Sequence, residues 1–434
     1  MPRPQLAEFM RRMDANSVAI LPSAREALRS NDSHYRYRQN SDFYYLTGFD
    51  EPESIAVIAP AHNEHKYMLF VRPRDPEREV WGGRRAGVEG AKSDYEADAS
   101  FKTDEFREKL GDLLNGAKHL YYRVGEDAEI DDIIIKQITR MRALGRRGVH
   151  APESITEPGT ILHEMRLIKT DEEIAVMSRA ADITAEAHRE AMMSARPGMN
   201  EYEIEALIEY IFRRNGAAAP AYTSIVGGGA NATVLHYVSN NATLRDGDLL
   251  LVDAGAEYET YAADITRTFP VNGRFTKPQA EVYELVLEAQ LAAIEMVKPG
   301  VTIDELHNRS VEILTAGMVR LGLLEGEPAK LIEEETYKRF YMHRLGHFLG
   351  MDVHDVGRYQ LDGQSRRVEA GMVLTIEPGL YIANGAEGAP DKYYGIGVRI
   401  EDDVLVTADG NRVLTHAAPK RIEDIEKLMA RSKG

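Results

Sequence analysis

The chain has 434 residues, of which 43% are hydrophobic and 28% charged, a composition typical of globular proteins with two or three domains. Asp and Glu outnumber Lys and Arg by 70 to 53, and the net charge of −17 argues against nucleic acid or an anionic membrane as the main partner. Because there is no cysteine, disulfides, thiolate metal ligands and cysteine nucleophiles are excluded. The first residues lack the apolar core of a secretory signal, and no apolar run approaches the roughly 18 residues of a membrane span, so we expect a cytoplasmic location.

The N-terminal part has the pattern of a mixed α/β domain. Short apolar runs predict strands at 17–21, 54–58, 66–71 and 120–124, and amphipathic patterns predict helices at 5–13, 103–114 and 130–144. The charged, Gly-rich segment 72–98 holds the only tryptophan, Trp81, and we expect a long loop there, either functional or disordered. The best domain boundary lies between residues 150 and 170, which predicts domains at 1–165 and 166–434.

Helix signals are sharper after this boundary. Capping residues at Thr170, Asn200, Thr276 and Thr302 each predict the start of a helix. Segments 196–200 and 298–302 share a basic-Pro-Gly pattern at an offset of 102 residues. Each joins a long amphipathic helix to a second helix, and strand-like runs follow each pair. This pattern predicts a degenerate internal duplication, in which two helix–helix–sheet halves surround a shared sheet and leave a cleft for a site.

The segment 247–269 has the pattern of a β-hairpin, with two strand-like runs around a Gly-containing turn. If the turn is centred between Tyr258 and Glu259, Asp253 and Asp264 lie directly opposite each other, with Cβ atoms about 5 Å apart. Two buried carboxylates so placed are costly unless a cation lies between them. The alternative is a different register with two solvated aspartates.

Three further segments carry groups that bind metals or transfer protons: in chain order, His343, His347 and His354, then Glu377, then Arg399 with Glu401. The histidines fall within twelve residues, beside glycines that allow close backbone approach. Taken singly, each has an ordinary structural explanation. The histidines could be structural, Glu377 could be a surface residue that ends a strand, and Arg399 with Glu401 could be an ion pair on one face of a strand.

Together the segments supply four carboxylates and one imidazole, from Asp253, Asp264, His347, Glu377 and Glu401. Such an oxygen-rich set suits Mn²⁺, with Co²⁺, Zn²⁺ or Fe²⁺ as possible substitutes. Four carboxylates balance two divalent ions and leave room for a bound hydroxide. Two ions that share a water can lower its pKa and polarise a carbonyl, so the set predicts metal-assisted hydrolysis of an amide or ester.

The order of these five residues resembles the ligand set of the pita-bread metallopeptidases. The string His-x-x-Gly-His-x-x-Gly-x-Asp-Val-His-Asp at 343–355 and the segment 38–48 resemble the aminopeptidase P branch, and the resemblance covers nearly the whole chain. It implies a smaller mixed α/β N-terminal domain and a C-terminal pita-bread (creatinase/aminopeptidase-like) domain with pseudo-twofold duplication. It also implies a dinuclear-metal enzyme that cleaves Xaa-Pro-peptides before proline through a metal-bridging hydroxide, and a homo-oligomer, either tetramer or dimer.

The resemblance assigns a role to each ligand position. Asp253 would chelate one metal, and Asp264 and Glu401 would bridge both. His347 and Glu377 would complete the second site, and Glu377 would also take a proton from the bridging water.

The remaining roles concern substrate. His236 and His354 would hydrogen-bond substrate or the tetrahedral oxyanion, His343 would line the prolyl side, and Arg399 would orient a carboxylate ligand. Further substrate contacts are expected from Tyr222, from Tyr359 and, near the active site of a neighbouring subunit, from Trp81.

One residue departs from the family pattern. Arg344 stands where a small residue is common, which puts the rim charge and the subsite preference in doubt. Prolidase, which cuts only Xaa-Pro dipeptides, is the alternative that shares all five ligands, and a non-catalytic metal- and peptide-binding relative is the alternative from another class. Methionine aminopeptidase fits less well because of the large N-terminal domain, and creatinase-like hydrolysis because the metal set is kept.

Overall fold

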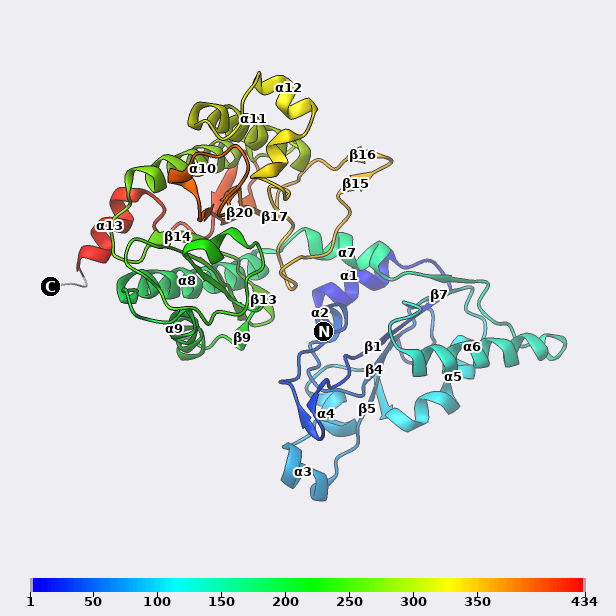
Figure 1. Ribbon diagram of the computed structural model, residues 1–434. Coiled ribbons are helices and arrows are strands. Elements are labelled where there is room, and N and C mark those ends of the chain that lie inside the picture. The colour runs from blue at the N-terminus through cyan, green and yellow to red at the C-terminus, as the bar shows by residue number, and fades with distance from the viewer. Residues whose placement is uncertain (1–2, 432–434) are drawn as a thin grey trace. The chain divides into compact units, whose positions relative to one another are not determined.

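The computed structural model describes residues 3–431, which form two compact units divided between Met165 and Arg166 (Figure 1). Helix α7 (Gly159–Leu167) contains this division. Within residues 3–431, none of the helices combines the length and the apolar character needed to cross a lipid bilayer.

The N-terminal unit is built on a six-stranded mixed sheet in the order β6-β5-β4-β1-β7-β8. Its strands are β1 (Ser17–Pro22), β4 (Ile55–Ile58), β5 (Tyr67–Val71), β6 (Ala99–Lys102), β7 (His119–Tyr121) and β8 (Ser154–Thr156). Its longer helices are α1 (Pro4–Arg12), α5 (Phe106–Leu114) and α6 (Ala128–Ala143), and α2 (Ser41–Thr47) is one of its shorter helices. A small hairpin pairs β2 (Leu28–Ser30) with β3 (Ser33–His34). Apolar side chains of α5 and α6 pack with those of the sheet in one core, as the α/β pattern of the sequence predicts.

The long loop expected at 72–98 is a wrong prediction. This segment forms two short helices, α3 (Pro76–Gly82) and α4 (Gly87–Ser93). Asp75 caps α3 by accepting a hydrogen bond from the backbone N–H of Arg78 at 3.2 Å, and Pro76 occupies the first turn. These two local signals favour a helix despite the glycines. Trp81 lies on α3 and is 91% exposed.

The C-terminal unit contains two long helix pairs. Its helices are α8 (Asp171–Ser194), α9 (Glu201–Arg214), α10 (Lys277–Met296), α11 (Ile303–Leu321), α12 (Pro328–Glu333) and α13 (Ile422–Arg431). The four long helices begin directly after the predicted capping residues, and all four caps form capping boxes. The first residues of α9 and α11 are 102 apart, which is the offset of the predicted duplication.

Short antiparallel strands lie between the two helix pairs in Figure 1. Three three-stranded sheets form: one from β10 (Ile225–Gly228), β11 (Leu249–Asp253) and β14 (Thr266–Pro270), one from β17 (Val373–Ile376), β20 (Asp402–Val406) and β21 (Asn411–Val413), and one from the shorter strands β9 (Ala219–Pro220), β12 (Ala256–Tyr258) and β13 (Tyr261–Ala262). Two-stranded sheets form from β18 (Gly379–Ile382) and β19 (Ile396–Arg399), and from β15 (Gln360–Leu361) and β16 (Gln364–Ser365). Buried side chains of both helix pairs and of several strands form one continuous core.

The expected pairing of Asp253 with Asp264 is also wrong, because Asp253 lies opposite Thr266. The two turn residues are Glu259 and Thr260, both with positive φ, so the turn is centred one residue later than expected. That shift moves the pairing by two residues, and an even shift keeps a side chain on the same face. The two aspartates therefore still face each other diagonally.

Candidate active site

One cleft of the C-terminal unit, about 800 Å³ in volume, collects nearly all of the predicted site residues. Its lining includes the five predicted ligands Asp253, Asp264, His347, Glu377 and Glu401, and also Tyr222, His236, His343, Arg344, His354, Tyr359 and Arg399. Trp81 belongs to the other unit.

Strand ends deliver the four carboxylates to the cleft. Asp253 is the last residue of β11, Asp264 lies just before β14, Glu377 follows β17, and Glu401 joins β19 to β20. The hydrophobic runs that precede or follow them form buried strands, so the sheet core fixes the backbone from which each carboxylate extends.

His347 comes from an irregular segment that packs against the end of β17. Its backbone N–H donates to Thr375 Oγ1 at 3.0 Å, and its carbonyl accepts from the backbone N–H of Thr375 at 2.9 Å. A Cβ atom on Gly346 would lie only 1.9 Å from the carbonyl oxygen of Thr375, so glycine is required for this close approach. The imidazole Nδ1 lies 3.0 Å from the carbonyl of Phe348, which leaves Nε2 facing the carboxylates.

Three of the predicted ligands form a tight cluster. Ligating atoms of Asp264, His347 and Glu401 lie within 4.8 Å of one another. His347 Nε2 is 3.5 Å from Asp264 Oδ2 and 3.6 Å from Glu377 Oε1. The side chains are well shielded, since Asp264 is 5% and Glu401 2% exposed.

Burial makes this arrangement costly without a cation. It raises the pKa of Asp264 and of Glu401 well above the usual range, and the neighbouring carboxyls add to the effect. Burial and the charge of Glu401 raise the pKa of Glu377 to about 8. A divalent ion would remove this penalty, and the oxygen-rich donor set with one imidazole fits Mn²⁺ or a similar metal.

Two polar side chains, Arg399 and Tyr222, form hydrogen bonds with the aspartates of the cleft. Arg399 Nη2 donates to Asp253 Oδ2 at 2.6 Å, and its Nε donates to Thr266 Oγ1 at 3.1 Å. The Tyr222 hydroxyl lies 2.6 Å from Asp253 Oδ1 and also contacts Asp264 Oδ1. Because a hydroxyl has one proton, one of these contacts requires a protonated carboxyl, in line with the raised pKa of Asp264.

The predicted histidines surround the carboxylates. The ring of His354 packs edge-on against that of His347 at 4.4 Å between centroids. Burial lowers the pKa of His343 to about 4, and burial lowers that of His354, so both imidazoles are neutral at pH 7. His236 is exposed on the segment that follows β10. The Tyr359 hydroxyl accepts from the backbone N–H of Phe348 at 2.9 Å, which ties Tyr359 to the histidine segment.

Comparison with known proteins identifies this arrangement. The family model described as metallopeptidase family M24 matches residues 175–408, and the model described as aminopeptidase P, N-terminal domain, matches residues 4–121. The chain belongs to metallopeptidase family M24. The expected family, the two-domain fold with a pita-bread domain and the metallo-aminopeptidase class are therefore confirmed.

Similar M24 proteins align along almost the whole chain. The Xaa-Pro aminopeptidase of Escherichia coli strain K12 is 46% identical over 97% of this chain and 97% of its own length. The solved structure of Pseudomonas aeruginosa aminopeptidase PepP is 48% identical, with a TM-score of 0.97 over 99% of this chain and 97% of that one. The structure of E. coli aminopeptidase P with the inhibitor Pro-Leu is 46% identical, with a TM-score of 0.95 over 99% and 97% of the two chains.

Sequence reasoning missed three residues of this M24 site. The Tyr381 hydroxyl lies 2.9 Å from His343 Nε2 and 3.0 Å from Arg399 Nη1. Thr266 Oγ1 donates to Glu401 Oε2 at 2.7 Å. Asp403 Oδ2 accepts from the backbone N–H of Asp264 at 3.1 Å. Only Asp403 had a signal in the sequence, since it lies two residues after Glu401 in an apolar strand and so shares its face.

Proposed function

We propose that this M24 enzyme releases the N-terminal residue from peptides whose second residue is proline. The observation that supports the proposal is the convergence in one cleft of the five proposed ligands and three further histidines, His236, His343 and His354. Further support comes from the similar E. coli and P. aeruginosa aminopeptidases, and the inhibitor Pro-Leu in the E. coli structure begins with proline.

The proposed cofactor is a pair of divalent ions, with Mn²⁺ as the best match to the donors. Asp253, Asp264, His347, Glu377 and Glu401 would hold them. When bound, the ions would lower the pKa of a shared water and polarise the scissile carbonyl.

The protein's own groups then handle protons and substrate. Glu377 would also accept a proton from the shared water, since its carboxylate lies in the cleft with Oε1 3.6 Å from His347 Nε2. Neutral His354 and the exposed His236 can donate N–H groups to a substrate oxygen. His343 would line the prolyl side, because its Nδ1–H already donates to the Arg344 carbonyl at 2.7 Å. Arg399 keeps Asp253 oriented. A prolyl nitrogen has no N–H, so recognition of proline depends on the shape of apolar lining such as Ile225 and Leu235.

Assembly and location are part of the proposal. The exposed Trp81 on α3 supports a homo-oligomer in which this side chain approaches a neighbouring subunit's site. Light scattering measures the mass of the assembly, and Trp81→Ala is expected to lower activity if the contact forms. We also propose a cytoplasmic location, which cell fractionation checks.

The decisive experiment measures hydrolysis of three peptides by Mn²⁺-reconstituted protein: Xaa-Pro-Xaa, the dipeptide Xaa-Pro and Xaa-Ala-Xaa. We expect release of the first residue from the proline tripeptide only, and loss of this activity with a chelator and in Asp264→Ala. Cleavage confined to the dipeptide would establish a prolidase instead. Metal-loaded protein that cleaves none of the peptides would support a binding protein.

A further inference from the structure

Glu401, Asp402 and Asp403 are three consecutive buried acidic residues whose side chains serve different purposes. Alternate residues of a strand point to opposite faces, so Glu401 and Asp403 share the face of the cleft while Asp402 points away from it. Glu401 lines the cleft, and Asp403 accepts from the backbone N–H of Asp264. The cleft chemistry described above leaves Asp402 without a role.

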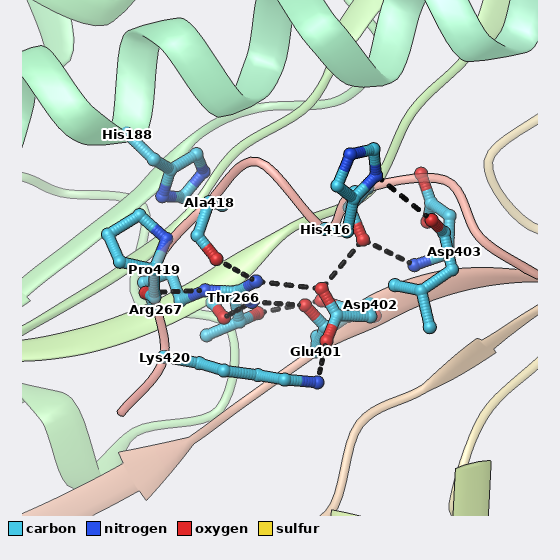
Figure 2. A network of polar contacts seen from close by, with 12 residues as sticks. His188, Thr266, Arg267, Glu401, Asp402, Asp403, His416, Ala418, Pro419 and Lys420 are labelled. Carbon is cyan, nitrogen blue, oxygen red and sulfur yellow. Dashed lines mark hydrogen bonds and ion pairs between the residues drawn. The ribbon is translucent and has the colours of Figure 1, made fainter. Parts of the chain in front are cut away.

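Asp402 is fully buried and accepts four hydrogen bonds. Figure 2 shows those from Arg267 and Lys420. The donors and distances are Arg267 Nη2 at 2.7 Å, Thr415 Oγ1 at 2.6 Å, Gln290 Nε2 at 2.7 Å and Lys420 Nζ at 2.6 Å. Although burial opposes ionisation, Arg267 and Lys420 hold the pKa of Asp402 well below its usual range, so the carboxylate is charged.

Arg267 is equally buried and connects Asp402 to backbone carbonyls from three segments (Figure 2). Besides Asp402, its guanidinium donates to the carbonyls of Thr266, Glu401, Ala418 and Pro419. Since a guanidinium has five N–H groups, these contacts use its full donor capacity.

This network fixes Glu401 at both ends. Arg267 Nη1 holds the Glu401 carbonyl, and Thr266 Oγ1 holds the Glu401 carboxylate at 2.7 Å. The same Nη1 also donates to the Thr266 carbonyl at 2.9 Å. One guanidinium therefore bridges the backbone at Thr266 and the backbone at Glu401.

A buried ion pair contributes little net stability compared with apolar residues of similar volume. A role in packing alone therefore does not account for two fully buried charges beside the metal cluster. Groups that orient ligands through hydrogen bonds do affect metal affinity, typically by 10–100-fold.

We propose that Arg267 and Asp402, together with Lys420, form a positioning unit that holds Glu401 for metal binding. The inference rests on the proposed function, because it requires Glu401 to be a metal ligand. It gives the C-terminal segment 415–420 a role at the metal centre, although that segment contributes no side chain to the cleft lining.

The test measures binding of Mn²⁺ alone to the full chain by isothermal titration calorimetry, with circular dichroism as the check on folding. Arg267→Lys keeps the charge but has three N–H donors for the five acceptors and lacks the planar fork, so we expect Mn²⁺ affinity to fall about 10–100-fold. Lys420→Met removes one of the four hydrogen-bond donors to Asp402. Because the Lys420 side chain is 19% exposed, this substitution disturbs the core less than Arg267→Lys does. It therefore tests the positioning unit if Arg267→Lys does not fold. Its expected loss of affinity is about 3–10-fold, smaller than the 10–100-fold typical of such effects, because three donors to Asp402 remain.

Arg123→Lys is the matched control, because Arg123 pairs with the buried Asp42 at 3.2 Å within the N-terminal unit. It is expected to keep wild-type Mn²⁺ affinity even where it lowers thermal stability. Unchanged affinity in folded Arg267→Lys and Lys420→Met would overturn this inference alone. Wild-type protein that binds no Mn²⁺ would overturn the proposed function as well, so the two failures are distinguishable.

Discussion

The carboxyl groups of the cleft lie close enough for their negative charges to repel one another. Repulsion and burial favour protonation, so metal binding should depend on pH. The pKa of Glu377 is about 8 in the metal-free protein, and those of Asp264 and Glu401 are also raised. Below pH 8 Glu377 carries a proton that must leave when a metal binds. The titration of Glu377 is therefore expected to make Mn²⁺ affinity rise with pH up to about 8.

Calorimetry in two buffers with different ionisation enthalpies counts the protons released on Mn²⁺ binding. We expect at least about one proton at pH 6 and fewer at pH 8.5, and Glu377→Gln should release fewer protons at pH 6. Binding with no proton release at pH 6 would show that the carboxyls are already ionised in the metal-free state.

A second titrating group lies outside the cleft. His188 on α8 is fully buried, its Nε2 lies 3.1 Å from the Ala254 carbonyl, and burial lowers its pKa from 6.5 to about 4. The unfolded chain binds a proton at this residue below pH 6.5, whereas the folded chain does so only near pH 4. Stability is thus full above pH 6.5 and falls by about 3 kcal/mol as pH drops towards 4.

Urea unfolding of metal-free protein at pH 7, 5.5 and 4.5 measures this loss. His188→Gln, whose amide can still donate to the Ala254 carbonyl, should show a smaller loss than the wild type. His416→Gln, at an exposed position, is the control and should keep the wild-type slope. Equal slopes in all three proteins would assign the acid sensitivity to other groups.

The proposed ligands could be assigned to one site from the sequence because several follow a local pattern, such as an aspartate that ends an apolar run, and the cleft lining brings them together. Tyr381, Thr266 and Arg267 could not, because their roles depend on strands that meet only in the folded unit. Thr266 faces Asp253 through the register of β11 and β14, and that register depends on the conformation of a turn. Positive φ at Glu259 and Thr260 has no glycine to mark it in the sequence.

At the scale of elements, one buried side chain at the start of α9 holds the segment that carries His236. Glu201 is fully buried and accepts four hydrogen bonds, from the backbone N–H groups of Gly228 and Ala242 and the side chains of Asn231 and Tyr237. The segment between β10 and β11 is therefore anchored to a helix rather than free to move.

Glu201→Gln is expected to loosen this segment, because an amide nitrogen cannot accept from the N–H and O–H donors that face it. The cost is about 1–3 kcal/mol in stability. We expect kcat/KM to fall about tenfold, equivalent to about 1.4 kcal/mol, with Mn²⁺ affinity unchanged since no proposed ligand lies on the segment. Glu205→Gln on the same helix is the control for the change of charge, and an equal effect in both variants would exclude the anchoring role.

Helix positions were predictable because capping boxes are local, and the four long helices begin where those boxes place them. The segment 72–98 shows that amino-acid composition alone can mispredict secondary structure. Its glycine content predicts a loop, but Asp75 and Pro76 start a helix. Local capping chemistry predicts such short elements better than the average character of a segment.

At the scale of the whole molecule, the C-terminal unit repeats one helix–helix–sheet arrangement that the described residues of the N-terminal unit lack, and the offset of 102 residues shows the repeat in the sequence. The repeat predicts a cleft in one half of the chain, because two related halves enclose a space between them. It cannot predict which side chains from the two halves meet in that space. Those contacts, such as Arg399 with Asp253, depend on how the sheets of the two halves pack.

Two separate units should respond differently to removal of the metal. All proposed ligands belong to the C-terminal unit, so metal binding should stabilise that unit and leave the other unchanged. At a free metal concentration 100 times Kd the gain is about 2.7 kcal/mol, which corresponds to a rise in Tm of about 5–10 °C. A chain with two compact units is not expected to unfold in one two-state transition.

Differential scanning calorimetry of metal-loaded and chelator-treated protein tests this expectation. One transition should move down by about 5–10 °C on chelation while the other stays in place. In Asp264→Ala the Tm of the sensitive transition should not change when Mn²⁺ is added, because one of the proposed ligands is missing. If chelation lowered the Tm of both transitions equally, the two units would unfold together. If chelation changed neither Tm, the carboxyl cluster would contribute no metal-linked stability.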